Sequence, residues 1–372
     1  MLIGVPKEIK NHEYRVGLIP SSVRELTSRG HSVMVERNAG TGIGAADSAY
    51  EKAGAKMAGN AADVFARADM IVKVKEPQAD ERAMLRSDQI LFTYLHLAPD
   101  PDQCRDLVTS GAICIAYETV TQTGGGLPLL APMSEVAGRM SVQAGAYCLE
   151  RAHGGMGVLL GGVAGVPPAR IVILGAGVVG TNAAQMAVGT GAQVVVMDRS
   201  VDALRRIDRL LGARVMTIFS NRDNVEEQVL SADLVIGGVL VPGAAAPKLV
   251  TRKMVDAMKP GAVIVDVAID QGGCCETAHA TTHADPTYIV GQVVHYCVAN
   301  MPGGVPRTST YALNNATLPF VLQLAEHGWQ KALQTDVHLR NGLNVCRGKV
   351  TYREVADALG LEFQTPEAAI AA

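Results

Sequence analysis

The chain has 372 residues, 48% of them hydrophobic, and a formal net charge of −3 at pH 7. This length exceeds one ordinary hydrophobic core, so we expect two domains. The small negative charge gives no electrostatic case for nucleic-acid binding. The longest uncharged stretch, 154–169, is too short and too rich in Gly and Pro to span a membrane.

The N-terminus and the cysteines predict a cytoplasmic protein. The first residues, M-L-I-G-V-P-K-E, lack the basic and long apolar regions of a signal peptide. Seven cysteines, an odd number without CxxC spacing, indicate reduced thiols. Cys274 and Cys275 form the only close pair, which we interpret as two buried apolar residues.

Strands and helices alternate through the first 117 residues, where apolar runs are separated by segments with Pro, Gly or polar ends. This alternation predicts a mostly parallel, doubly wound sheet. The predicted strands are 2–5, 31–36, 70–75, 90–95 and 113–117, and the predicted helices are 21–29, 47–53, 61–68 and 100–110.

Two long helices are predicted farther along the chain. The first follows a Gly-rich turn at 121–128 and runs from Ser134, its expected N-cap, to Ala152. The second begins near Thr308 and continues past Pro319. The strands expected between these helices, apart from those of the motif described next, are 215–219, 234–239, 263–267 and 296–298.

The stretch 170–198 is the central motif of the chain. An apolar run leads into Gly175-x-Gly177-x-x-Gly180, a small-residue helix follows, and a second apolar run ends in Asp198. The first glycine permits a tight turn, the second lets a pyrophosphate approach the backbone, and the third allows close helix–strand packing. A carboxylate at the position of Asp198 can accept both ribose hydroxyls of NAD. We therefore predict an NAD-binding Rossmann unit.

These patterns predict an α/β protein with two doubly wound parallel-sheet domains joined by long helices. If the second long helix packs back on the first domain, that domain is discontinuous. We expect a substrate domain at 1–128 plus 307–372 and a Rossmann domain at 129–306. The Ala-rich tail, 367–372, is expected to be frayed.

Several cations in the first domain are candidate ligands for an anionic substrate. Arg15 lies in a polar loop after the first strand, and Lys73 and Lys75 lie near the end of the strand 70–75. A spacing of two predicts that both ammonium groups share one face, at the strand end where open α/β sheets bind ligands. His96 ends another strand and is a candidate acid/base group. The alternatives are solvated surface charges and a structural histidine.

The second domain also carries polar residues where strands end. Asp266 or Asp270 is expected at the cofactor cleft, and the amide of Asn300 can bond a nicotinamide or a substrate. His279 and His283 have no Cys or carboxylate partners at metal-ligand spacing, so we interpret them as loop residues and predict no metal site.

Taken together, these segments resemble the alanine dehydrogenase/pyridine nucleotide transhydrogenase family, and specifically its alanine dehydrogenases. The resemblance covers nearly the whole chain. It is carried by V-P-K-E-I-K-N-H-E-Y-R-V, V-K-V-K-E-P, Y-L-H-L, P-M-S-E-V-A-G-R-M, G-G-V-x-G-V, D-L-V-I-G-G-V-L-V-P-G-A, A-P-K-L-V, V-D-V-A-I-D-Q-G-G-C, H-Y-C-V-A-N-M-P-G and V-P-R-T-S-T-Y-A-L.

The resemblance implies an L-alanine:NAD oxidoreductase of alanine catabolism that forms pyruvate, ammonia and NADH. It also implies a discontinuous substrate domain, a Rossmann domain and a homohexamer. Arg15 and Lys75 resemble the pair that binds the substrate carboxylate, His96 the general acid/base, and Asp270 the second catalytic group. The cofactor-binding positions implied are Ser134, Gly175, Gly177, Val178, Val179, Gly180, Asp198, Ser220, Val239, Leu240, Val267, Ala268, Ile269, Asp270, Val298, Ala299, Asn300 and Met301.

The chain departs from the family pattern at two places, and other functions remain open. The family often has Arg-Pro where this chain has His279-Ala280, and a basic residue where it has Ala203. The alternatives are a nucleotide-binding part of a proton-translocating transhydrogenase, a saccharopine- or lysine-forming dehydrogenase, and an NAD-sensing binding protein. The last would leave Arg15, Lys75 and His96 unexplained.

Overall fold

Two compact units make up the chain in the computed structural model, which describes residues 1–239 and 246–371. Unit 1 consists of Met1–Met133 and Val305–Ala372, and unit 2 consists of Ser134–Gly304. Unit 1 is therefore discontinuous in sequence. The two units are compact bodies, which need not coincide with the functional domains. The functional domain limits expected at 128 and 306 stay a prediction.

The sheet of unit 1 has eight strands in the order β15-β14-β6-β5-β4-β1-β2-β3. Its strands are β1 (Leu2–Val5), β2 (Ser32–Glu36), β3 (Lys56–Ala58), β4 (Met70–Val72), β5 (Ile90–Thr93), β6 (Ile113–Ala116), β14 (Leu343–Cys346) and β15 (Lys349–Val350). The six from β6 to β3 are parallel, while β14 and β15 pair antiparallel at one edge. The strand order reverses between β1 and β4, which is the switch point of a doubly wound sheet.

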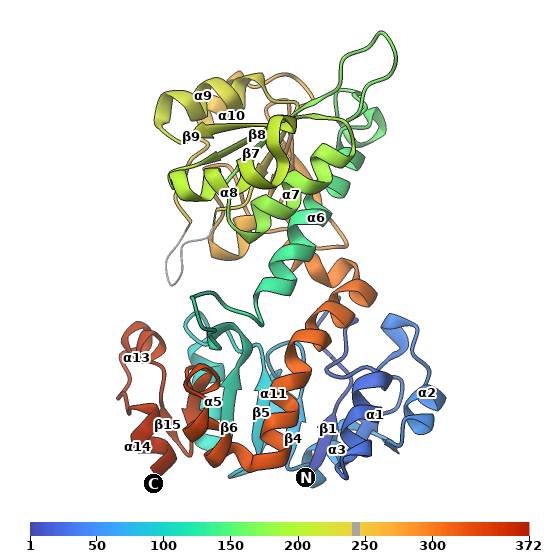
Figure 1. The fold of residues 1–372 in the computed structure, drawn as a ribbon, viewed down its shortest axis with the longest axis vertical. Helices are drawn as coiled ribbons and strands as arrows, with labels where there is room; N and C mark the ends of the chain where they lie inside the picture. Colours follow the sequence, from blue (N-terminus) through green and yellow to red (C-terminus); the bar gives the residue numbers. More distant parts are fainter. Residues whose placement is uncertain (240–245, 372) are drawn as a thin grey trace. The chain divides into compact units, whose positions relative to one another are not determined.

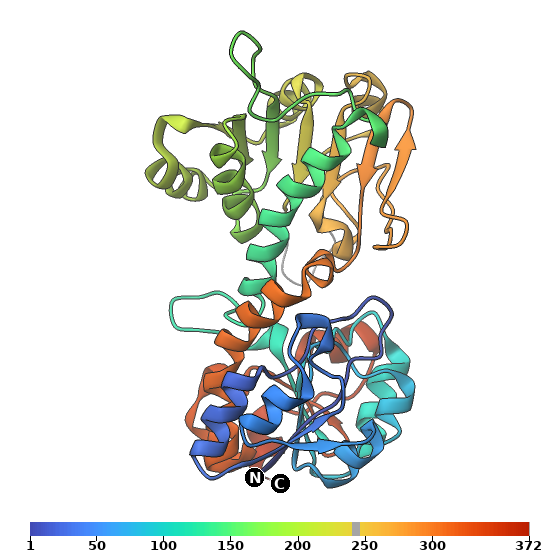
Figure 2. The ribbon, with the colours of Figure 1, turned by 90° about the vertical axis from the view of Figure 1, so that its right-hand side faces the viewer.

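Helices from both chain segments cover this sheet. They are α1 (Pro20–Ser28), α2 (Asp47–Lys52), α3 (Ala61–Arg67), α4 (Ala79–Arg82), α5 (Pro101–Ser110), α11 (Pro306–Thr335), α12 (Val337–Arg340), α13 (Arg353–Leu359) and α14 (Pro366–Ala371). Helix α11 continues past Pro319, as predicted, and kinks at Gly328 (φ 73°). Figure 2 shows α11 alongside α1, so the C-terminal segment packs on the N-terminal one.

Unit 2 is a second doubly wound sheet, of seven strands in the order β12-β13-β11-β10-β7-β8-β9 (Figure 1). Its strands are β7 (Arg170–Leu174), β8 (Gln193–Asp198), β9 (Val215–Phe219), β10 (Leu234–Gly237), β11 (Val263–Asp266), β12 (Thr287–Val290) and β13 (Val293–Tyr296). All pair in parallel except the edge strand β12. The parallel strands have the Rossmann order, with the switch point between β7 and β10.

Helices cover both faces of this sheet too. They are α6 (Ala131–Cys148), α7 (Val178–Gly189), α8 (Val201–Leu211), α9 (Arg222–Ser231) and α10 (Arg252–Ala257). Apolar side chains of α6, α7 and α8 form one core with the sheet, and those of α9 and α10 form another. The prediction of two doubly wound α/β units is confirmed.

Several expected boundaries were wrong. Helix α6 begins at Ala131, so Ser134 lies inside the helix and is not its N-cap. Strand β13 ends at Tyr296, where the sequence had placed the start of a strand. The tail is not frayed over its described length, because α14 buries Ala369 and Ile370 against β14.

Candidate active site

The candidate substrate-binding residues of unit 1 lie on loops that leave neighbouring parallel strands. Arg15 lies between β1 and α1, Lys75 follows β4, and His96 follows β5. Strands β1 and β4 pair with each other, and β4 pairs with β5. All three loops leave the carboxyl edge of the sheet, and two of them flank its switch point, where such sheets bind ligands.

Arg15 is almost completely buried and is held by a carboxylate in its own loop. Its Nε and Nη2 donate to the two oxygens of Glu13 at 2.7 and 2.6 Å, and its Nη1 lies 3.1 Å from the sulfur of Met133. Burial alone would lower the pKa of Arg15, but hydrogen bonding and charge from Glu13 outweigh it and raise the pKa. The guanidinium is therefore fixed and charged, as a carboxylate-binding group requires.

The two lysines of the V-K-V-K-E-P segment have different environments, so the prediction that they share one face was wrong. Strand β4 ends at Val72, and the period-two alternation does not continue beyond it. Lys73 is fully buried, with its ammonium 3.0 Å from Glu8 and 2.6 Å from Glu81. Lys75 stays partly accessible, with its ammonium 3.7 Å from Glu76. Only Lys75 is placed to meet a solute.

His96 has a strained backbone and an accessible ring. Its φ is +50°, which is uncommon for a residue with a Cβ. The carboxylate of Glu118 accepts the backbone N–H of Leu95 at 3.1 Å and that of His96 at 2.6 Å, and lies 3.8 Å from the His96 Nδ1. The ring stacks on Tyr94 at 5.8 Å, and 44% of the side chain is exposed. Strain that the surroundings enforce in this way is typical of functional sites.

The glycine-rich turn of unit 2 has the geometry of a dinucleotide-binding turn. Gly175 has φ +103°. A Cβ on Gly180 would lie 1.8 Å from the carbonyl oxygen of Gly175, whereas a Cβ on Gly177 would meet nothing within 4 Å. Gly177 precedes α7, and no side chain caps that helix. No side chain occupies the first N–H groups of α7, and such a helix start is suited to a pyrophosphate.

Asp198 ends β8 beside this turn. Its carboxylate accepts the N–H of Ala176 at 2.7 Å and that of Ser200 at 2.7 Å. A carboxylate can accept about four hydrogen bonds, so capacity remains for ribose hydroxyls. The N–H of Ser220 donates to the backbone oxygen of Asp198 at 3.0 Å, which brings these two predicted positions together.

The two acidic candidates, Asp266 at the end of β11 and Asp270 in the turn that follows, have different environments. Asp266 is fully buried and accepts the N–H groups of Ala268, Cys274 and Cys275 at 3.1, 2.8 and 3.2 Å. Burial raises the pKa of Asp266, although these hydrogen bonds oppose the rise. Asp266 thus organises the loop through these three hydrogen bonds.

Asp270 is the exposed member of that pair. The backbone N–H of Asn300 approaches its Oδ1 at 3.4 Å, and Asn300 itself has φ +59°. His283 places its Nε2 3.2 Å from the backbone oxygen of Asn300. The loops after β11 and β13 are therefore tied together at the carboxyl edge of the unit 2 sheet.

The other predicted cofactor positions lie on the same edge or on helices beside it. Val178 and Val179 begin α7, Val239 follows β10, and Val267, Ala268 and Ile269 form the turn after β11. Val298 and Met301 are buried in the core, Ala299 is half-buried between them, and Ser134 is half-buried on α6. Leu240 lies outside the described residues. Their contacts with a cofactor stay predictions.

The two departures from the family pattern have local structural roles. The ring of His279 stacks on Tyr288 at 3.7 Å, and the backbone N–H of His279 donates to the Tyr288 hydroxyl. Ala203 is buried in the first turn of α8, where its N–H donates to the Ser200 hydroxyl.

Over residues 1–239 and 246–371 no group of His, Cys, Asp or Glu could hold a metal ion. Within the same ranges no helix is long and apolar enough to cross a membrane.

Several structural partners of the site were missed from the sequence: Glu8, Glu13, Tyr94 and Glu118. The three carboxylates bond to backbone groups or charged side chains of other site residues, and the ring of Tyr94 stacks on His96. Only Glu13 had a readable signal, since it lies two residues before Arg15 in the same polar loop.

The glycine geometry gives a test of cofactor binding. We expect Gly177→Ala to fold with a loss of at most about 1 kcal/mol and to bind NAD at least roughly tenfold more weakly, because the methyl group enters the open space. Gly180→Ala, whose methyl group would clash with the Gly175 carbonyl, should instead lower stability by roughly 1–3 kcal/mol. Thermal unfolding and NAD titration measure both. Unchanged NAD affinity in Gly177→Ala would contradict the assignment of this turn.

The fold and the site define a two-domain α/β protein of the nucleotide-binding dehydrogenase type. Residues 4–137 match the family described as "Alanine dehydrogenase/PNT, N-terminal domain", and residues 141–353 match its C-terminal domain. The chain belongs to the alanine dehydrogenase/pyridine nucleotide transhydrogenase family.

Individual relatives agree with this assignment. The chain is 61% identical to the alanine dehydrogenase of Halomonas elongata over 98% of each chain. Its structure is similar to a solved L-alanine dehydrogenase, with a TM-score of 0.94, 54% identity and coverage of 97% of this chain and 99% of that one. A transhydrogenase structure from Sinorhizobium meliloti is more distant, with a TM-score of 0.83 and 29% identity over 94% of this chain and all of that one.

Proposed function

We propose that the chain is an L-alanine dehydrogenase, which catalyses the reversible NAD-dependent oxidative deamination of L-alanine to pyruvate and ammonia. The observation that carries the proposal is the 61% identity to an alanine dehydrogenase over 98% of both chains. The aligned region covers 98% of this chain and therefore extends over both units.

The cofactor is NAD, and the residues of unit 2 fit it. The open space at Gly177 and the uncapped start of α7 would take the pyrophosphate, and Asp198 would take the adenosine ribose. Bound NAD supplies the acceptor for the hydride that leaves the alanine Cα. Asp270 and Asn300, joined at 3.4 Å, would line the part of the site nearest the reaction.

The residues of unit 1 bind the substrate and move its protons. Arg15, fixed by Glu13, and Lys75 bind the carboxylate and so hold the Cα for transfer. Hydration of the imine and collapse of the carbinolamine require a group that accepts and returns a proton. His96 does this at Nε2, since its Nδ1 lies 3.8 Å from Glu118. Asp270 orients the attacking water or the departing ammonia.

A spectrophotometric assay tests this function. We expect NADH to form from NAD with L-alanine, and to be consumed with pyruvate plus ammonia. Profiling the other amino acids is the control, and a clear preference for lysine or glutamate would indicate another amino-acid dehydrogenase. Hydride exchange between NADH and NADP without alanine oxidation would support the transhydrogenase alternative.

The carboxylate-binding pair gives a second prediction. Lys75→Ala and Arg15→Ala should each raise the KM for pyruvate and for alanine by roughly 10–100-fold, and should also lower kcat, because both affinity and position are lost. The control is Lys56→Ala, which removes an exposed ammonium from β3 of the same unit. If Lys75→Ala behaves like the control, Lys75 is only a surface charge.

The resemblance also supports a cytoplasmic homohexamer. All seven cysteines are free, which suits a reducing compartment.

An exposed turn carries apolar side chains that a hexamer could cover. Val163 and Val166, which form a β-bridge with each other, are 61% and 58% exposed, and Leu159 is 65% exposed. Apolar side chains gathered in this way are typical of surfaces covered in an assembly. Analytical ultracentrifugation should give a mass six times that of the chain.

A further inference from the structure

The backbone that carries Lys75 is fixed although it has left the strand. Strand β4 ends at Val72, yet every backbone polar group from Lys73 to Lys75 has a partner. Four of these groups bond to β5 or to residues near it. The N–H of Lys73 donates to the Phe92 oxygen, and the Lys73 oxygen accepts the Tyr117 hydroxyl. The Val74 oxygen accepts the N–H of Tyr94, and the Lys75 oxygen accepts the Thr93 hydroxyl. The two remaining groups, the N–H of Val74 and that of Lys75, point the other way.

One carboxylate serves both of these N–H groups. Glu8 Oε1 accepts the N–H of Val74 at 2.7 Å and approaches that of Lys75 at 3.4 Å. Glu8 lies in the loop after β1, so its side chain reaches across the switch point of the sheet to the segment after β4. It thus links the loop that contains Arg15 to the backbone of Lys75.

The position of Glu8 is itself fixed by a buried cation. Its Oε2 lies 3.0 Å from the ammonium of Lys73, which lies 2.6 Å from Glu81. All three side chains are almost completely buried. Burial disfavours the ammonium, but the two carboxylates outweigh it and raise the pKa of Lys73. The cation therefore stays charged and anchors Glu8.

We propose that Glu8 is a positioning residue for the substrate: by holding the N–H groups of Val74 and Lys75, it fixes the point from which the Lys75 ammonium reaches the substrate carboxylate. This role rests on the proposed function, in which Lys75 binds that carboxylate. It also gives Lys73 a role that the sequence pattern did not suggest, as the anchor of Glu8 instead of a second substrate ligand.

Glu81 provides a matched control. It is as buried as Glu8 and shares the same ammonium, but its second oxygen accepts the N–H of Gln78 and not that of Val74 or Lys75. Glu8→Gln and Glu81→Gln each remove one of the two carboxylates that contact the Lys73 ammonium and leave the other in place. The two variants differ in one respect: only Glu8→Gln removes the carboxylate that accepts the N–H groups of Val74 and Lys75.

The experiment compares the two variants in the full-length enzyme. In Glu8 the two oxygens face different donors, Oε1 the N–H of Val74 and Oε2 the ammonium of Lys73, so a glutamine at position 8 must turn its NH2 group, which only donates, toward one of them. For Glu8→Gln we expect faster amide hydrogen exchange at Val74 and Lys75 and a KM for pyruvate raised roughly tenfold. We also expect a smaller loss of kcat and unchanged NAD affinity. Glu81→Gln should lower the melting temperature to a similar extent but leave that exchange unchanged and the KM within about twofold.

The outcomes separate positioning from general stability. Equal KM increases in both variants, or an unchanged KM and exchange in Glu8→Gln, would overturn the proposal. If Glu8→Gln does not fold, Glu8→Asp, which keeps the charge but withdraws the oxygens, is measured with the same two readings. A parent enzyme that forms no NADH from alanine overturns the proposed function instead. The exchange measurement then decides alone whether Glu8 fixes the segment.

Discussion

Replacing His96 by alanine is expected to lower kcat by ~10²–10⁴ while NAD binding is retained, since general acid/base groups contribute about this much. The physical reason is that the variant has no imidazole to take up and return the proton during hydration of the imine and collapse of the carbinolamine. Steady-state kinetics in both directions, together with NAD titration, measure the two effects.

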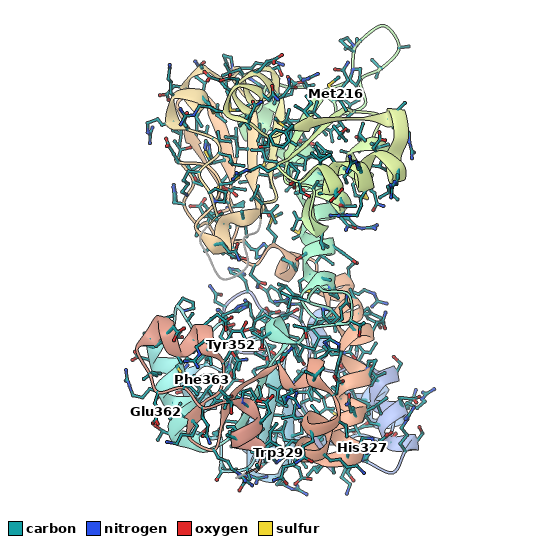
Figure 3. All side chains as sticks on the ribbon, turned by 60° about the vertical axis from the view of Figure 1, so that its left-hand side comes forward. Met216, His327, Trp329, Tyr352, Glu362 and Phe363 are labelled. Atoms are coloured by element: carbon teal, nitrogen blue, oxygen red, sulfur yellow. The ribbon has the colours of Figure 1, made fainter. Side chains whose placement is uncertain are left out.

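The control for this variant is His327→Ala. His327 is an exposed histidine on α11 (Figure 3). It should keep the kcat of the parent. If His96→Ala also keeps kcat within a factor of a few, His96 is only a surface residue in a strained turn and has no place in the mechanism.

A second comparison separates the ring of His96 from its backbone. Since φ is +50° there, an asparagine fits the left-handed conformation better than alanine does. His96→Asn should therefore be more stable than His96→Ala but equally slow. If His96→Asn regains activity, the alanine variant lost its function through the backbone and not through the missing imidazole.

The sequence predicted the fold and the main positions of the site for a clear physical reason. Apolar runs, glycines and strand ends are local signals, and the carboxyl ends of parallel strands meet at one edge of a sheet. Arg15, Lys75, His96 and Asp198 could therefore be placed at two sheet edges before any coordinates. What each residue does in catalysis stays a prediction.

The errors come from contacts between residues distant in sequence. The alternation argument extended β4 to Lys75, but the strand ends at Val72 and Lys73 pairs with Glu8 and Glu81. No pattern around a lysine reveals that carboxylates from two other segments surround it. The sequence left Asp266 and Asp270 as alternatives for the same reason, because the partners of Asp266 are backbone N–H groups of a loop that folds back on it.

Replacing Asp198 by alanine is expected to lower the ratio of kcat/KM for NAD to kcat/KM for NADP. NAD should be used less well and NADP better. The loss of charged hydrogen bonds to the ribose, worth about 1.5–3 kcal/mol, should reduce kcat/KM for NAD by roughly 10–100-fold. The use of NADP should improve, because the carboxylate no longer repels a 2′-phosphate. Arg199 follows Asp198, and Arg205 and Arg206 lie one or two turns along α8; all three are exposed, and their charge can attract that phosphate.

The competing explanation is that Asp198 only caps the next helix, and the structure supplies a matched test of it. Ser200 is the N-cap of α8, since its hydroxyl accepts the N–H of Ala203 at 3.2 Å. Ser200→Ala should lower stability by about 0.5–2 kcal/mol and leave the NAD/NADP ratio of kcat/KM alone. Asp198→Ala should lower stability too, because the N–H of Ala176 loses its acceptor, but it should also change the ratio. If both variants lose stability and neither changes the ratio, Asp198 supports the turn without binding the ribose, and the assignment of 170–198 as an NAD-selective site is wrong.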